Sequence, residues 1–205
     1  MIATLLAALG SLQAMLLSPI VQPLPAEVRA AMIGSSWREG CPVPLDELRL
    51  VLVPHRVAEG RSATGRLILH QEHALPVAEV FVQLHGMGFL IPSLRPAYEF
   101  GGDDDAMMRA NNTSAFNCRP IAGTGTWSEH AWGRALDLNP LWNPYVRGER
   151  VDPPEGEPFV ERQAGRAGTV VPGDAVVAAF REIGWRWGGT WTRAQDYQHF
   201  SSTGR

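Results

Sequence analysis

Residues 127–140 read "WSEHAWGRALDLNP" and place a histidine and an aspartate, His130 and Asp137, seven positions apart. Gly133 between them permits a sharp turn, so the chain can fold the histidine back over the segment that carries the aspartate. Asp137 stands between two leucines, where a carboxylate is costly unless an ion pair or a metal compensates its charge. A histidine in an ordinary loop is the simpler interpretation of this stretch, because two ligands do not make a catalytic metal centre.

A second polar pair follows near the end of the chain, in "DYQHF" at residues 196–200, where Asp196 and His199 lie among aromatic residues. Combined with the first stretch, the chain offers two imidazoles and one carboxylate, from His130, Asp137 and His199. This set suits Zn²⁺ with three protein ligands and an open fourth position for water. Asp196, close in sequence to one ligand, would then be placed to accept the proton of the activated water.

Both stretches resemble the motifs of one group of zinc peptidases. "SEHAWGRALD" resembles the Ser-x-His-x-x-Gly-x-Ala-x-Asp motif of the family that includes D-alanyl-D-alanine carboxypeptidases, D-Ala-D-Ala dipeptidases and L-alanyl-D-glutamate endopeptidases. "DYQHF" resembles the second motif, in which an acidic residue stands three positions before the last histidine. The resemblance covers roughly residues 96–203. It implies that zinc is bound by His130, Asp137 and His199, and that Asp196 is the catalytic base.

The same resemblance implies a hedgehog/DD-peptidase-like α+β fold and a peptidoglycan stem peptide as the substrate. "NNTSAFNCRPI", residues 111–121, is similar to the family's segment before the first motif. There Arg119 would bind a substrate carboxylate or stabilise the oxyanion through charge-assisted hydrogen bonds, and Ser128 would hydrogen-bond the substrate. The alternatives are a structural salt bridge for Arg119 and a turn cap for Ser128.

One departure from the family pattern bears on which bond is cut. Carboxypeptidase and dipeptidase members usually have Glu three positions before the last histidine, whereas this chain has Asp196. The aspartate favours an L-Ala-D-Glu endopeptidase over a D-Ala-D-Ala carboxypeptidase. Two other functions stay open: a non-catalytic, zinc-stabilised module that binds the cell wall, and a zinc amidase or esterase that acts on a small molecule.

Length and composition predict one domain. The chain has 205 residues and a formal net charge of −3, without a basic patch of the kind that binds nucleic acid. Residues 24–205 are expected to form a single zinc peptidase domain, and nothing implies a stable protein partner. Residues 1–23 fit a signal, an anchor or an extra N-terminal segment, although they lack a positively charged start. A signal or anchor would place the protein in the cell envelope or outside the cell.

The hydrophobic pattern predicts an α+β domain with a small antiparallel sheet, flanking helices and long loops. The expected helices span residues 24–34, 75–89 and 174–184, and the expected strands span residues 48–55, 65–71, 135–139, 185–189 and 196–200. The Pro- and Gly-rich stretch 139–173 is predicted to run over the surface. Cys41 and Cys118 are either two unpaired core residues or one disulfide, which would indicate an oxidising compartment.

Overall fold

The computed structural model describes residues 18–205, so the predicted signal or anchor at the start of the chain lies mostly outside the described residues. Within residues 18–205, no helix is long and apolar enough to cross a membrane.

The α-helices are α2 (Ala26–Met32), α3 (Gln71–Gly86), α4 (Asp104–Arg109) and α5 (Ala175–Glu182). The 3₁₀ helices are η1 (Leu45–Glu47), η2 (Ala97–Phe100), η3 (Glu129–Trp132), η4 (Pro154–Phe159) and η5 (Gly188–Thr190). The strands are β1 (Ile20–Pro23), β2 (Leu48–Ala58), β3 (Arg61–His70), β4 (Ser93–Leu94), β5 (Asn112–Thr113), β6 (Ala135–Asp137), β7 (Tyr145–Arg147), β8 (Arg150–Asp152), β9 (Arg186–Trp187), β10 (Gln195–Asp196) and β11 (His199–Ser201).

The N-terminal sheet has the antiparallel order β1-β2-β3. Its first strand, β1, lies inside residues 1–23, which the sequence analysis predicts to be a separate N-terminal segment. The strand pairs with β2, with Ile20 opposite Leu52 and Pro23 opposite Arg49. The hairpin is longer than predicted, because β2 and β3 extend to a tight turn at residues 59–60 in place of the expected loop at 57–64. Gly60 supplies the positive φ of 68° that this turn requires.

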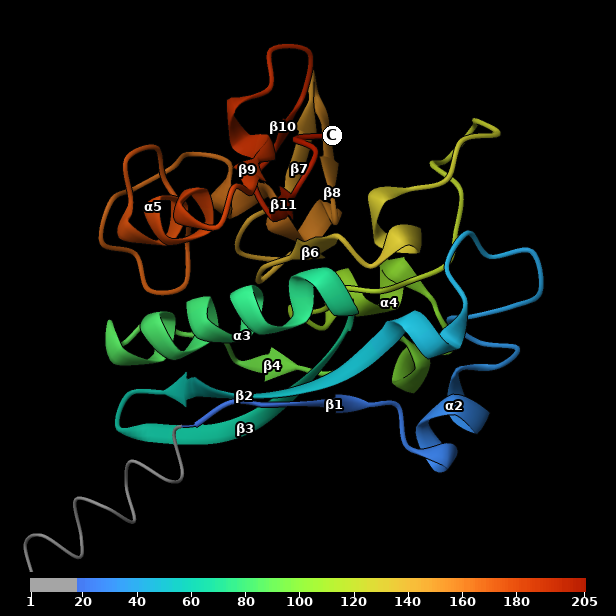
Figure 1. The fold of residues 1–205 in the computed structure, drawn as a ribbon. Helices are drawn as coiled ribbons and strands as arrows, with labels where there is room; N and C mark the ends of the chain where they lie inside the picture. The colour runs from blue at the N-terminus through green and yellow to red at the C-terminus, as the bar shows by residue number, and fades with distance from the viewer. Residues whose placement is uncertain (1–17) are drawn as a thin grey trace, which may run out of the picture.

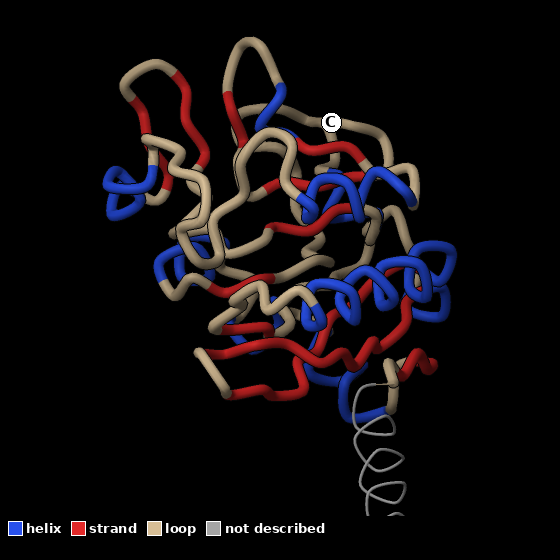
Figure 2. The backbone as a smooth tube through the Cα atoms, turned by 90° about the vertical axis from the view of Figure 1, so that its left-hand side faces the viewer, coloured by secondary structure: helices blue, strands red, loops and turns tan. Residues whose placement is uncertain are grey.

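Helix α3 lies between the N-terminal sheet and the C-terminal half of the chain, as two perpendicular views show (Figure 1 and Figure 2). It begins at Gln71, earlier than predicted, because the His70 side chain accepts a hydrogen bond from the Glu72 amide and caps the helix. Its buried face contains Val77, Phe81 and Leu84, each with no exposed surface. These side chains belong to a hydrophobic cluster that residues of both halves of the chain share, and a second cluster lies around Met32 and Phe116.

The C-terminal half is built from short strands. They form two antiparallel sheets, ordered β6-β11-β9 and β10-β7-β8, and a parallel pair of β4 and β5. The α+β class with small antiparallel strand pairing is therefore confirmed, and within residues 18–205 the strands are distributed over several small sheets where a single one was predicted. Strands of two or three residues are too short to show an alternating pattern in the sequence.

The stretch 139–173 contains the β7–β8 hairpin and η4 and is anchored to the core by buried polar side chains, not merely laid over the surface. Asn139 donates from Nδ2 to the carbonyls of Leu90 and Gly168, at 2.7 and 2.9 Å. Arg162 donates to the Val170 carbonyl at 2.6 Å and stacks 4.7 Å from the centroid of the Tyr197 ring. These groups satisfy main-chain carbonyls of the stretch, at Gly168 and Val170, and that of Leu90 outside it, in place of a strand partner.

The last predicted elements are present with altered boundaries. Helix α5 matches the predicted helix 174–184, but the Asp174 carboxylate accepts from the Val171 amide at 2.8 Å and does not cap the helix with its side chain. The predicted strand 185–189 narrows to β9 and continues as η5. The predicted strand 196–200 is divided between β10 and β11.

Cys41 and Cys118 form a disulfide across 77 positions of sequence, with their Cα atoms 6.0 Å apart. The bond joins the loop after α2 to the segment that leads to Arg119. Replacing both cysteines by serine is expected to lower the free energy of unfolding by roughly 2–4 kcal/mol, because the unfolded chain gains loop entropy. Denaturant titration of both proteins, with and without reductant, measures this change. The reduced wild type should match the double variant, and an unchanged unfolding midpoint would contradict the prediction.

Candidate metal centre

His130 is placed by a short, capped turn. Ser128 precedes η3, and its hydroxyl accepts a hydrogen bond from the His130 amide at 3.3 Å. Gly133 ends η3 with a φ of 65°, in the left-handed region, and strand β6 begins two residues later. The predicted turn between histidine and aspartate is therefore present, and it brings the imidazole of His130 over the strand that carries Asp137.

The pairing of β6 with β11 brings in the third residue. In this antiparallel register His199 lies directly opposite Asp137, and opposite residues of neighbouring strands project from the same face of a sheet. The leucines on either side of the aspartate, Leu136 and Leu138, are fully buried in the core, as the alternation predicted. The sheet thus separates an apolar face from the face that holds the polar cluster.

Three side chains converge on one point. The Nε2 atom of His130 lies 3.2 Å from Nδ1 of His199, and these nitrogens lie 3.3 and 3.1 Å from the two carboxylate oxygens of Asp137. Tetrahedral ligands about 2.0–2.1 Å from a zinc ion are separated from each other by about 3.3 Å. The ligand set named from the sequence therefore has the spacing of a zinc site, and both histidines are buried.

The outward nitrogens of the two rings fix their tautomers. Nδ1 of His130 lies 2.6 Å from the Ala115 carbonyl, and Nε2 of His199 lies 2.8 Å from the main-chain oxygen of Arg205. Because a carbonyl can only accept, each of these nitrogens carries the proton and donates it outward. When both rings are neutral, the inward nitrogens and the Asp137 oxygens are all acceptors, and a cation, either a proton or a metal ion, is what such a group of lone pairs requires.

The electrostatics of the cluster agree with this requirement. Burial alone would raise the pKa of Asp137, but the charge of His130 and the hydrogen bonds with both imidazoles hold it well below its usual range. Burial opposes the charged form of His199, yet the hydrogen bond with Asp137 and its negative charge raise the pKa of His199 to about 9. In the absence of a metal the cluster attracts a proton, and a metal ion would take that proton's place.

Asp196 lies beside the three residues without being one of them. Strand β10 holds it opposite Tyr145 of β7, so the hairpin of the 139–173 stretch positions this carboxylate. Burial raises the pKa of Asp196 to about 6, with a further contribution from the charge of Asp137 and opposition from His199. Its Oδ1 atom is buried and has no hydrogen-bond partner within residues 18–205. A free acceptor with a pKa near neutrality is suited to proton transfer.

Arg119 and Ser128 both make the structural contacts that the sequence analysis gave as alternatives to substrate binding, an ion pair and a turn cap. Arg119 forms an ion pair with Asp104, whose position at the start of α4 is set by the Asp103 cap. Burial lowers the pKa of Arg119, and the charges of Asp137 and Asp196 oppose this. The guanidinium therefore lies within electrostatic reach of the cluster. The Ser128 hydroxyl caps η3 and is also a donor.

Sequence reasoning missed the groups that hold the ligands in place. The outward acceptors are main-chain oxygens of Ala115 and Arg205, and every residue has such an oxygen, so no side-chain motif could have revealed them. Glu129 was also missed, although it stands inside the first motif. It accepts hydrogen bonds from Arg134 and Thr203.

Comparison with known proteins supports the same chemistry. Residues 122–202 match the family model described as D-alanyl-D-alanine carboxypeptidase. The resemblance to this peptidase family is confirmed. The match covers less than half of the chain; it includes the converging cluster and Asp196, whereas Arg119 lies just before it. No curated protein and no solved structure matches the chain.

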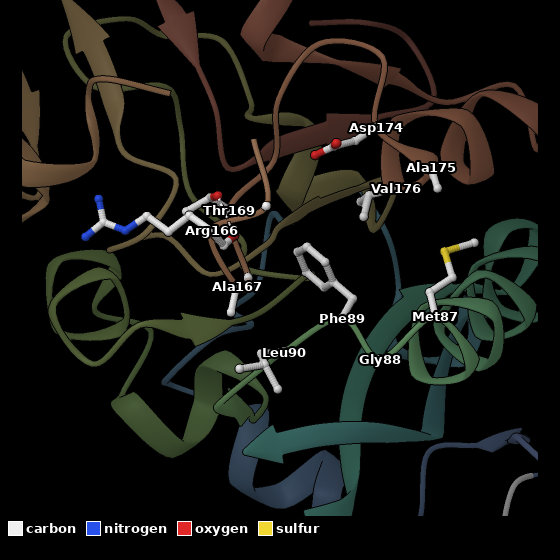
Figure 3. A pocket seen from close by; sticks show the side chains of 12 residues that line it. Met87, Gly88, Phe89, Leu90, Arg166, Ala167, Thr169, Asp174, Ala175 and Val176 are labelled. Atoms are coloured by element: carbon white, nitrogen blue, oxygen red, sulfur yellow. Dashed lines mark hydrogen bonds between the residues drawn. The ribbon is translucent and has the colours of Figure 1, made fainter. Parts of the chain in front are cut away.

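A separate concavity of about 240 Å³ lies between the end of α3 and residues 165–176 (Figure 3). Phe89 and Leu90 lie on one side of it and Arg166 and Asp174 on the other. Its lining contains none of the six residues that the carboxypeptidase family resemblance assigns to the site. The concavity is therefore separate from the His-Asp-His cluster.

The glycine of the carboxypeptidase family's first motif has a physical role here. Gly133 has a φ of 65°, and a Cβ atom added to it would lie 2.6 Å from the main-chain nitrogen of His70. Gly133→Ala is expected to cost roughly 1–3 kcal/mol of stability, from backbone strain and from the clash with a main-chain atom.

Thermal and denaturant unfolding measure this cost, with Gly125→Ala as the control. An added Cβ at Gly125 meets nothing within 4 Å, and its φ is not positive. Equal stability of the two variants would show that the approach of Gly133 to His70 is not required.

Proposed function

We propose that the protein is a zinc-dependent peptidase that hydrolyses a peptide bond in peptidoglycan stem peptides, on a hedgehog/DD-peptidase-like fold. The observation that carries the proposal is the convergence of possible ligand atoms from His130, Asp137 and His199 at the mutual spacing of zinc ligands. The family match over residues 122–202 supports the reaction class. The substrate class, a peptidoglycan stem peptide, is taken from the same family, whose model is described as D-alanyl-D-alanine carboxypeptidase.

In this proposal His130, Asp137 and His199 hold the zinc ion. When bound, zinc would act as a Lewis acid toward water and toward the carbonyl of the scissile bond. Asp196 would accept the proton from the attacking water and deliver it to the leaving amine. Its raised pKa suits both steps, because the carboxylate is charged at neutral pH and can still be protonated during the reaction.

Arg119 and Ser128 would position the substrate. The charge of the guanidinium suits a stem-peptide carboxylate or the developing oxyanion. In the structure it is balanced by Asp104 and influenced by Asp196 and Asp137. The Ser128 hydroxyl uses a lone pair to cap η3, so its proton remains available for donation to a substrate carbonyl.

The choice of bond separates two versions of the proposal. The family model is described by D-alanyl-D-alanine carboxypeptidase activity, whereas Asp196 in place of the usual glutamate favours cleavage between L-Ala and D-Glu. A non-catalytic module that binds the cell wall remains the alternative function. The presence of a buried acceptor at Asp196 argues against it, since a module that only binds needs no base.

We further propose that the protein works in the cell envelope or outside the cell. The Cys41–Cys118 disulfide supports this placement, because such bonds persist in oxidising compartments. The negative net charge gives no support to nucleic acid as a partner.

Elemental analysis followed by mass spectrometry of digested peptidoglycan tests the function. One zinc per chain and fragments with a new N-terminus at D-Glu would establish an L-Ala-D-Glu endopeptidase. Release of terminal D-Ala would establish a carboxypeptidase. Zinc without any product would favour the binding module, and the absence of zinc would overturn the proposal.

A further inference from the structure

The outer hydrogen bond of His199 depends on a segment with no regular structure. Residues 202–205 follow β11, and the main-chain oxygen of Arg205 turns back to accept from Nε2 of His199 at 2.8 Å. The hydroxyl of Ser201 donates to the same oxygen at 2.9 Å. This segment therefore decides whether the proton of His199 sits on the outward nitrogen, which leaves Nδ1 free toward Asp137.

Hydrogen bonds to residues outside residues 202–205 hold this segment in place. The Thr203 hydroxyl donates to Oε2 of Glu129 at 2.8 Å, and the Ser202 amide donates to the carbonyl of Arg134 at 3.1 Å. The indole of Trp191 donates to the carbonyl of Gly204 at 3.1 Å. The Gly204 amide also donates to the Ser201 hydroxyl at 3.1 Å, so local bonds and these outside contacts together hold the Arg205 oxygen in place.

Glu129 is at the centre of these contacts. Its side chain is 13% exposed, and its carboxylate receives Nε of Arg134 at 2.7 Å as well as the Thr203 hydroxyl. It is also the residue immediately before His130, within η3. One carboxylate thus connects the turn that carries the first histidine with the segment that orients the second.

We propose that Glu129 is a positioning residue of the metal centre, which holds residues 202–205 through Thr203 and Arg134 so that the Arg205 oxygen fixes the tautomer and orientation of His199. The inference rests on the proposed function, because it assigns a role toward the metal that His199 would bind. It adds to the ligand set and the base a residue that the first motif leaves unspecified.

Outer partners of metal ligands typically change metal affinity by about 10–100-fold when they are removed. Glu129→Gln preserves the size of the side chain but removes the charge that Arg134 pairs with. Thr203→Val removes only the hydroxyl that reaches Glu129. Each variant is expected to raise the dissociation constant for zinc by roughly ten-fold. Thr203→Ser keeps the hydroxyl and is expected to bind zinc as tightly as the wild type.

The experiment measures the zinc dissociation constant by competition with a chromophoric chelator, together with the visible absorption spectrum of the Co²⁺-loaded protein. The matched control is Glu99→Gln. Glu99 is 16% exposed and accepts from Arg66 and Arg95 at 2.7 Å each, but makes none of the contacts around His199. Unfolding of each variant in the presence of a chelator shows how much of any effect is loss of stability without metal.

Weaker zinc binding and an altered Co²⁺ spectrum in Glu129→Gln and Thr203→Val, with Glu99→Gln unchanged, would support the inference. Wild-type affinity and an unchanged spectrum in both variants would overturn it while leaving the proposed function intact. A purely structural role would appear as equal stability losses in Glu129→Gln and Glu99→Gln without a change in zinc affinity, which also overturns it. Failure of the wild type to bind zinc would overturn the proposed function itself.

Discussion

Asp196→Asn is expected to lower turnover of a stem-peptide substrate by roughly 10²–10⁴-fold, the range typical of a lost general base. Asparagine has nearly the same shape as aspartate but cannot accept a proton at neutral pH. The loss should fall on turnover and not on metal content, because Asp196 is not one of the three residues whose ligand atoms converge. The free acceptor Oδ1 is the atom that we expect to act.

Hydrolysis of purified muropeptides, followed by mass spectrometry, measures this effect, with zinc content determined on the same samples. Asp46→Asn is the control, since the Asp46 side chain is 85% exposed and pairs with Arg29 at the surface. Wild-type turnover in Asp196→Asn would exclude the residue as the base. Loss of zinc from the same variant would instead make Asp196 a metal ligand.

His199→Ala is expected to abolish tight zinc binding and, with it, the stabilisation that zinc gives the folded protein. A ligand that binds only the native state at 100 times its dissociation constant adds about 2.7 kcal/mol to the free energy of unfolding. Without His199 only two side chains of the cluster remain, and the centre cannot provide the three ligands that a catalytic zinc site needs. Activity should disappear together with the zinc-dependent stabilisation.

His85→Ala is the matched control for this loss. His85 is buried to a similar degree, with 8% exposure against 6% for His199, and it bonds to Ser62 on the hairpin, away from the cluster. Unfolding is measured with and without zinc for each variant, and with a chelator for the wild type. Zinc-dependent stabilisation that persists in His199→Ala would show that the metal binds elsewhere.

The first two residues of the ligand set, His130 and Asp137, were accessible from sequence because they lie only seven positions apart. Gly133 permits the turn, and alternation along β6 places Asp137 on the face opposite its two leucines. His199 and Asp196 were recognised by their residue types in the second stretch, and the family motifs supported combining the two stretches, because no local rule could bridge their separation. In the folded chain, the pairing of β6 with β11 brings the two stretches together, because it places His199 opposite Asp137.

Several features followed only from the folded chain. Strand β1 depends on pairing with β2, because four residues give too little pattern to predict a strand. The anchoring of residues 139–173 depends on Asn139 and Arg162, whose partners are main-chain carbonyls brought near by the fold. The disulfide was one of two open alternatives until the distance between Cys41 and Cys118 was known.

The sequence by itself determined the α+β class, the peptidase family motifs and the residues that converge on the candidate zinc site. These depend on residue type, periodicity and short spacings, which are properties of the linear chain. The tertiary structure alone decided the outward hydrogen bonds of His130 and His199 and the contacts of Glu129, because these bonds depend on where the backbone runs. A carbonyl is present at every position, so only its location in space can distinguish the one that orients a ligand.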